Sequence, residues 1–551
     1  MNRAGGLLVA GTASDAGKSV VVAGICRWLA RLGVRVAPFK AQNMALNSAV
    51  TPDGAEIGRA QVAQAAAAGI APEAAMNPIL LKPSGERHSQ VVVLGKSLTD
   101  VDARSYRELR HTLRDVVLDS LADLRRRFDV VVCEGAGSPA EINLRDGDLV
   151  NMGLARAAGL PVVLVGDIDR GGVFASLFGT LALLERADQA LVAGFLINKF
   201  RGDRAVLEPG LEQLGGLTGR PVLGVLPWLR GLWLDVEDSL ALEAPREGAL
   251  PPLGRDPLTV AVVRLRWISN FTDFDALAAE PGVVVRFTQS PADLLAADLA
   301  VLPGTKATVA DLAWLRERGL DRALADRAAS HRPTLGICGG YQMLGKRVVD
   351  PVESGAGEVE GLGLLPVETV FAPDKALGNP AGHAVAFGGV PVAGYEIHHG
   401  RVRRFDGEPL VVRPTGPRST GARPTGPRPT GARSTGAPLW GSPDPSGPWG
   451  SPDPSGPAGE EGCRSGAVLG LTWHGVFEGD AFRRAFLSWV AKRRGLDWVP
   501  GDRPFAEVRE ERLDLLGDLI AEYADTAALE RLIEAGAPPG LDFVPPGGPP
   551  P

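Results

Sequence analysis

At 551 residues the chain exceeds what one hydrophobic core usually holds, so we expect more than one domain. Hydrophobic residues make up 45% of it and charged residues 22%, which excludes a largely disordered chain. The formal net charge is -7 and no dense basic stripe is present, so we expect no nucleic-acid partner.

Short apolar runs alternate with helical patterns over residues 1–245, which we predict to be the first domain. The runs are rich in β-branched residues, and they include Leu7–Ala10, Val130–Cys133, Pro161–Val165 and Ala193–Ile197. Uninterrupted apolar strands are typical of a parallel sheet that is buried on both faces. Helices between such strands indicate a doubly wound α/β domain.

A glycine-rich segment lies between the first predicted strand and a helical pattern over Val20–Leu32. In this position, glycines let backbone N–H groups converge on phosphate oxygens at the start of a helix. We expect Lys18 to reach the β- and γ-phosphates of ATP and the Ser19 hydroxyl to bind Mg²⁺. The predicted nucleotide-binding residues of this loop are Gly11, Thr12, Ser14, Asp15, Ala16, Gly17, Lys18 and Ser19.

The loop departs from the strict phosphate-loop spacing, because Thr12 stands where that pattern has glycine. In this respect it resembles the loop of the dethiobiotin synthetase-like ligases, which have the form GTxxxxGK[ST]. The related ATPases of the ParA/MinD group carry a lysine near the start of the loop, where this chain has Thr12 and Ala13. The resemblance therefore favours a ligase over a partition-type switch.

Polar residues follow the second predicted strand, within the segment Pro38–Ser48. We predict that they face the phosphates or the reacting carboxylate of a substrate. Hydrogen bonds that only stabilise the loop are the alternative. The predicted substrate-binding residues are Lys40, Gln42, Asn43 and Asn47.

Two further residues end buried strands, at the edge of a parallel sheet where ligands gather. Glu134 is predicted to bind Mg²⁺ together with Ser19, with a purely structural role as the alternative. Asn198 follows another strand, in a segment that resembles the base-contacting loop of these ATPases. The resemblance implies that Asn198 contacts adenine.

A second α/β domain is predicted over residues 258–500, after a proline- and glycine-rich linker at 246–257. Its strands include Leu258–Val263, Leu299–Leu302 and Thr334–Ile337. Repeats rich in Pro, Gly, Ser and Thr make up residues 413–462, which we expect to be a disordered insertion of unknown role. A helical segment and a Pro/Gly-rich tail are predicted over 501–551.

Cys338 lies in this second domain, between a predicted strand and a helix start, and glycines surround it. A strained turn there exposes the sulfur, and the helix N-terminus lowers the pKa of the thiol. His474 ends a strand well downstream and is the predicted base. We therefore predict that Cys338 and His474 form a catalytic pair.

The pair resembles the class I glutamine amidotransferases, whose thiolate attacks the side-chain amide of glutamine and releases ammonia. The resemblance implies an oxyanion hole formed by the backbone N–H groups of Gly304 and Gly339. Most of that class has a glutamate two residues after the histidine, where this chain has Val476. The site is then either degenerate or a dyad, and the corrinoid-amidating synthases resemble the second case.

Several segments strengthen the resemblance to these corrinoid-amidating synthases, and to the branch of the family that makes cobyric acid. They are Pro38–Ser48, Asp169–Ala175, Ile268–Asp275 and Gly394–Gly400. The resemblance implies successive amidation of the b, d, e and g carboxylates of adenosylcobyrinic acid a,c-diamide in cobalamin biosynthesis. Each amide consumes ATP and glutamine through an acyl phosphate, and a corrinoid polycarboxylate is the substrate.

Histidines 398 and 399 lie in the last of these segments. They are expected to contact substrate or to brace the amidase site. A metal there is not supported, because no carboxylate or cysteine stands at ligand spacing.

Three alternatives stay open at this point: a cobyrinic acid a,c-diamide synthase, another carboxylate amidator, or a regulatory ATPase with an inactive amidotransferase domain. The four cysteines form no CxxC pair, and neither a signal peptide nor a membrane span is recognisable. We therefore expect a cytoplasmic enzyme. The sequence leaves its oligomeric state and the path of ammonia open.

Overall fold

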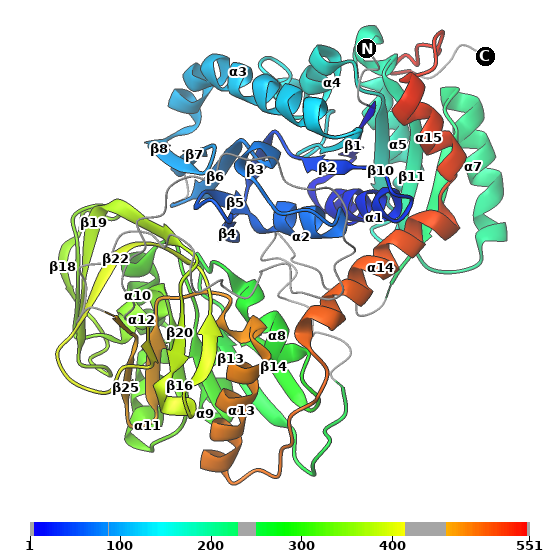
Figure 1. Cartoon of the computed structure of the whole chain (residues 1–551). Coiled ribbons are helices and arrows are strands. Elements are labelled where there is room, and N and C mark those ends of the chain that lie inside the picture. The colour runs from blue at the N-terminus through cyan, green and yellow to red at the C-terminus, as the bar shows by residue number, and fades with distance from the viewer. Residues whose placement is uncertain (1–4, 86–87, 230–249, 414–458, 548–551) are drawn as a thin grey trace, which may run out of the picture. The chain divides into compact units, whose positions relative to one another are not determined.

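The structure is a computed structural model that describes residues 5–85, 88–229, 250–413 and 459–547 (Figure 1). These residues divide into two compact units. The first contains 5–45, 51–229 and 509–547, and the second contains 46–50, 250–413 and 459–508. Of the predicted insertion, residues 414–458 lie outside the described residues. Residues 246–249 of the predicted linker and 548–551 of the predicted tail lie outside them as well.

A parallel sheet forms the centre of the first unit, with the strand order β12-β11-β10-β1-β9-β2. Its strands are β1 (Gly5–Gly11), β2 (Val36–Phe39), β9 (Val130–Glu134), β10 (Val162–Asp167), β11 (Val192–Phe200) and β12 (Val222–Pro227). The sequence order reverses at β1, which pairs with β9 on one side and β10 on the other. The predicted doubly wound fold is thereby confirmed, and β1 leads into the phosphate loop at the reversal point, where ligands bind in such sheets.

Helices pack against the strands of this sheet, and a smaller sheet with the order β3-β6-β7-β8 lies in the same unit. The helices are α1 (Lys18–Arg31), α2 (Arg59–Ala67), α3 (Ala103–Arg127), α4 (Met152–Ala158), α5 (Val173–Ala182), α6 (Arg186–Gln189), α7 (Arg204–Thr218), α14 (Phe505–Tyr523) and α15 (Thr526–Ala535). The remaining strands are β3 (Gln42–Met44), β5 (Glu56–Gly58), β6 (Ile79–Pro83), β7 (Ser89–Val93) and β8 (Lys96–Val101).

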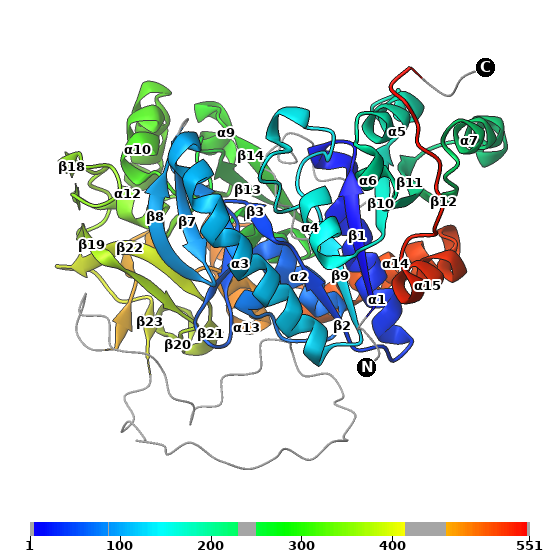
Figure 2. The same ribbon diagram turned by 90° about the horizontal axis from the view of Figure 1, so that it is seen from above.

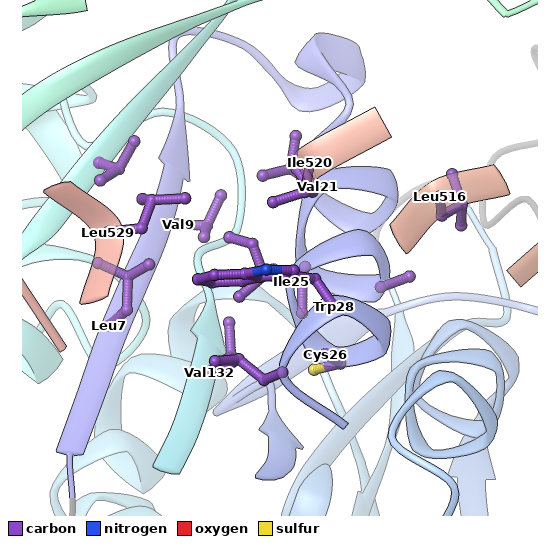
Figure 3. Packing of buried hydrophobic residues seen from close by; sticks show 14 of the residues in the cluster. Leu7, Val9, Val21, Ile25, Cys26, Trp28, Val132, Leu516, Ile520 and Leu529 are labelled. Carbon is purple, nitrogen blue, oxygen red and sulfur yellow. The ribbon is translucent and has the colours of Figure 1, made fainter. Parts of the chain in front are cut away.

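The C-terminal helices complete the hydrophobic core of the first unit. Leu7 and Val9 of β1 belong to one buried cluster with Val21 of α1, Ile520 of α14 and Leu529 of α15 (Figure 3). Figure 2 shows α14 and α15 beside α1. The far end of the chain therefore packs against the strand that leads into the phosphate loop.

A mostly parallel sheet with the order β14-β13-β15-β16-β26-β25 forms the centre of the second unit, and only β25 runs antiparallel to its neighbour. Its strands are β13 (Leu258–Val263), β14 (Val283–Thr288), β15 (Leu299–Leu302), β16 (Thr334–Ile337), β25 (Cys463–Ser465) and β26 (Val468–Leu471). Its helices are α8 (Asp275–Ala278), α9 (Pro291–Ala296), α10 (Thr308–Glu317), α11 (Leu320–Ala329), α12 (Gly339–Leu344) and α13 (Asp480–Arg494). The predicted second α/β fold is confirmed.

Shorter strands complete this unit: β4 (Ser48–Val50), β17 (Arg347–Asp350), β18 (Gly357–Glu360), β19 (Val367–Gly378), β20 (Ala381–Ala384), β21 (Val390–Ala393), β22 (Glu396–Arg404), β23 (Val411–Val412) and β24 (Glu460–Glu461). In the described parts of the chain, no helix combines the length and the apolar character that crossing a membrane requires.

Candidate active sites

The predicted phosphate loop runs from the end of β1 into α1. Gly17 has a φ of 95°, which favours glycine, and a Cβ added there would lie 2.0 Å from Asn198 Nδ2 and would displace that side chain. Asn198 Nδ2 donates to Ala16 O at 3.0 Å, and this amide therefore braces the loop. A contact of Asn198 with adenine stays a prediction.

Lys18, Ser19 and Glu134 meet beside the loop. Lys18 Nζ donates to the carbonyl oxygens of Ala13 at 2.8 Å and Ser14 at 2.9 Å. Ser19 Oγ donates to Glu134 Oε1 at 2.8 Å, so a hydroxyl and a carboxylate oxygen lie side by side. Mg²⁺ takes oxygen ligands of this kind and completes its shell with water and phosphate, so these residues fit the ion.

Glu134 is buried, and cationic and polar groups compensate its charge. Lys40 Nζ donates to Oε1 at 2.9 Å, and Gln64 Nε2 donates to Oε2 at 2.5 Å. Burial by itself would raise the pKa of Glu134, but Lys40, Gln64 and Lys18 outweigh it, and the pKa is lowered. Glu134 is therefore an ionised carboxylate next to the phosphate loop.

The side chains of Gln42 and Asn43 are hydrogen-bonded to other side chains of the first unit. Gln42 Oε1 accepts a hydrogen bond from the Tyr106 hydroxyl, and Asn43 Nδ2 donates to Gln61 Oε1 at 2.9 Å. Asn47 belongs to the second unit instead. A substrate role for Lys40, Gln42, Asn43 and Asn47 stays a prediction.

In the second unit, Cys338 lies on a sharp turn between β16 and α12. Its backbone has φ 50° and ψ -112°, a conformation that costs about 1–3 kcal/mol in a residue other than glycine. A Cβ added to Gly340 would lie 1.9 Å from Leu302 O, so the turn also depends on glycine behind it. The expected strained turn is thus present, but Cys338 is only 6% exposed, so the expectation that the turn exposes the sulfur was wrong.

His474 lies between Cys338 and a buried carboxylate. Its Nδ1 donates to Asp273 Oδ2 at 2.7 Å, and Asp273 Oδ1 accepts the Gly475 N–H at 2.8 Å. The sulfur of Cys338 is its other side-chain hydrogen-bond partner, which leaves Nε2 for that contact. Cys338, His474 and Asp273 therefore have the geometry of a nucleophile, a base and an orienting acid.

The charges of this trio reinforce one another. Burial works against a charged His474, but Asp273 and Cys338 raise the pKa of His474 to about 10. Burial works against a thiolate as well, but His474 and the Gly339 N–H lower the pKa of Cys338 below its usual value. The pair therefore favours a thiolate beside an imidazolium over two neutral groups.

This charge state predicts a distinctive pH dependence. The rate of Cys338 alkylation by iodoacetamide should fall with a midpoint below the usual thiol pKa of about 8.5, because His474 lowers the pKa of this thiol. Glutamine hydrolysis should decline as the pH rises through about 10, because His474 then lacks the proton for departing ammonia. The rate of alkylation, measured as a function of pH, checks the first prediction. The midpoint of this profile should move to higher pH in the His474→Ala variant. A wild-type profile with a midpoint near 8.5 would contradict the ion pair.

Both predicted oxyanion-hole glycines adjoin the trio. A Cβ added to Gly304 would lie 2.8 Å from His474 Cε1, and the Gly339 N–H points to the Cys338 sulfur. The backbone at these positions therefore lies beside the nucleophile and the base, as an oxyanion hole requires.

The two further histidines have ring nitrogens bonded to backbone oxygens. Nδ1 of His398 donates to Gly400 O at 2.7 Å, and Nδ1 of His399 donates to Ala372 O at 3.1 Å. Within the described residues, no group of three His, Cys, Asp or Glu side chains is placed to hold a metal. A contact of these histidines with substrate, or a role in bracing the amidase site, stays a prediction.

Asp273 is the functional residue that sequence reasoning missed. Val476 stands at the position where most of the class carries the glutamate that completes the triad. The structure supplies the acid from residue 273, in a different segment of the chain. A signal was present, since Asp273 lies in the unusual segment Ile268–Asp275.

Together the two units define a class of protein: a phosphate-loop nucleotide-binding domain joined to a glutamine amidotransferase. Residues 7–240 match the family described as the CobQ/CobB/MinD/ParA nucleotide binding domain. Residues 259–437 match the CobB/CobQ-like glutamine amidotransferase domain.

Full-length relatives narrow this class. The chain is 58% identical to the cobyric acid synthase of Frankia casuarinae, over 98% of this chain and 99% of that protein. It is 57% identical to the cobyric acid synthase of Streptomyces coelicolor, over 99% of both chains. The chain therefore belongs to the cobyric acid synthase family of glutamine-dependent, ATP-using amide ligases in cobalamin biosynthesis. The family resemblance found in the sequence is confirmed.

Proposed function

We propose that this chain amidates the b, d, e and g carboxylates of adenosylcobyrinic acid a,c-diamide, using ATP and glutamine for each amide. The observation that carries the proposal is the arrangement of Cys338, His474 and Asp273 in a chain that also has the phosphate loop Gly11–Ser19. The choice of a corrinoid rests on the family. We place the reaction in the cytoplasm, because it consumes ATP and depends on a reduced Cys338.

In the amidase unit, the Cys338 thiolate attacks the side-chain amide carbon of glutamine. The N–H groups of Gly304 and Gly339 stabilise the oxyanion of the tetrahedral intermediate. His474 then gives its proton to the departing nitrogen, so that ammonia leaves and a γ-glutamyl thioester stays on Cys338. Water, deprotonated by His474, hydrolyses the thioester to glutamate and restores the thiolate.

In the nucleotide unit, a substrate carboxylate oxygen attacks the γ-phosphorus of ATP, giving an acyl phosphate and ADP. Ammonia then attacks the acyl carbon, and phosphate leaves as the amide forms. Lys18 and the loop N–H groups bind the phosphates and orient them for this transfer. Ser19 and Glu134 would hold Mg²⁺, which supplies neutralisation of phosphate charge when bound.

The observation that favoured an inactive amidotransferase domain no longer supports it. That alternative depended on the missing acid at Val476, and Asp273 now provides a carboxylate on His474. A diamide synthase would differ from the proposed enzyme in the carboxylates that it amidates.

Product analysis tests the proposed function. The full chain is incubated with ATP, Mg²⁺, glutamine and cobyrinic acid a,c-diamide, and the products are analysed by mass spectrometry and NMR. We expect stepwise replacement of OH by NH₂ at b, d, e and g, with ADP and glutamate formed in step. In a parallel incubation with cobyrinic acid, amidation of the a and c carboxylates alone would instead assign a diamide synthase. Glutamine hydrolysis without any amide would refute the ligase.

A further inference from the structure

A short segment from early in the chain belongs to the amidase unit. Residues 46–50 contain β4, and both Asn47 and Ser48 are buried. The Ser48 N–H donates to Asn270 Oδ1 at 2.9 Å, and Asn47 Oδ1 accepts the Phe271 N–H at 3.2 Å. Two asparagines from distant parts of the chain therefore each accept a backbone N–H from the other segment.

These bonds lie at the start of the short 3-10 helix η5 (Phe271–Phe274), which carries Asp273. The first N–H groups of a helix have no partner inside it and need an acceptor from elsewhere. The side chain of Asn270, the residue before the helix, does not cap it, and Asn270 has a φ of 52°. Asn47 supplies the acceptor for Phe271, so the helix is capped by a residue from another segment.

The capped helix also connects the parts of the amidase site. The Asp273 N–H donates to Asn270 O at 3.0 Å, and the Ser269 N–H donates to Gly304 O at 2.9 Å. Both Asp273 oxygens are in use, one on His474 and one on the Gly475 N–H. Asn270 is therefore joined by a backbone hydrogen bond to the residue whose carboxylate binds His474.

We propose that Asn47 and Asn270 are positioning residues for glutamine hydrolysis, which hold Asp273 in the orientation that binds His474. The proposal rests on the proposed amidase function. It gives Asn47 a role in ammonia production in place of corrinoid binding. The residue acts through Asp273 and touches no reacting atom.

The full-length variant Asn47→Leu tests this, because leucine has a similar size but no acceptor. We expect glutamine-dependent turnover to fall by on the order of 10²-fold, the effect of a displaced catalytic group. Amide formation from free ammonia should keep its rate and its KM for the corrinoid, which also shows that the variant is folded. The pH midpoint of Cys338 alkylation should rise. Asn47→Asp keeps an acceptor oxygen and should restore most of the activity.

A double-mutant cycle provides a second test of the proposal. In the Asp273→Asn background, Asn47→Leu should cause no further loss, because the group it positions is already disabled. Additive losses would overturn the proposal, and so would a raised KM for the corrinoid with normal glutamine use. A wild-type chain that makes amides from ammonia but not from glutamine would instead overturn the proposed amidase function.

Discussion

Replacement of Cys338 by alanine is expected to abolish glutamine-dependent amide formation and to spare amide formation from free ammonia. Without the sulfur no thioester forms, and losses of at least about 10³-fold are usual when a nucleophile is removed. Ammonia added to the solution bypasses this step. The measurement is product formation from cobyrinic acid a,c-diamide with glutamine or with ammonium chloride as nitrogen donor.

Cys463 offers a matched control in the same unit. It is also buried and free, but burial raises the pKa of its thiol to about 11, so it is an inert thiol at neutral pH. Cys463→Ala should therefore retain glutamine use. Residual glutamine use by Cys338→Ala would show that the nucleophile has been assigned to the wrong residue.

The second large effect is expected for Asp273→Asn, a change of charge with almost no change of shape. The variant loses the carboxylate that orients His474 and stabilises its imidazolium form. The corresponding change in a serine protease costs about 10⁴-fold, so we expect on the order of 10³-fold in glutamine-dependent turnover. The rate with ammonia should not change, and the pH midpoint for alkylation of Cys338 should rise.

Asp326→Asn, on an exposed position of α11, is the control for the loss of one negative charge. It should behave as wild type. A fully active Asp273→Asn enzyme would mean that Cys338 and His474 work as a dyad, as the sequence had suggested. Kinetics with glutamine and ammonia, measured side by side, separate these outcomes.

The features that the sequence predicted correctly depend on local chemistry. The phosphate loop needs glycine at 17, where φ is 95°, and the helix that follows it directly in the chain. The turn at Cys338 likewise depends on its immediate neighbours Gly339 and Gly340. A strand, a glycine turn and a helix that follow one another are visible in the order of residues.

The features that could not be predicted from the sequence are contacts between segments that lie far apart in the chain. Asp273 lies 201 residues before His474, and the class pattern directed attention to the position two residues after the histidine. The hydrogen bond from the Phe271 N–H to Asn47 Oδ1, between residues 224 positions apart, was likewise not predicted. Such contacts follow from the path of the chain in three dimensions, which short motifs do not encode.

Each unit contains a segment from the other half of the sequence: residues 509–547 belong to the first unit and residues 46–50 to the second. A cut in the region of 246–257 would give an amidase fragment without the acceptor that caps the helix of Asp273. The other fragment would lack Ile520 and Leu529, so the strand that leads to the phosphate loop would expose its apolar face. Separating the chain at the apparent domain border should therefore yield two destabilised fragments. A unit exchanged between relatives has to include the segment that it takes from the other half of the sequence.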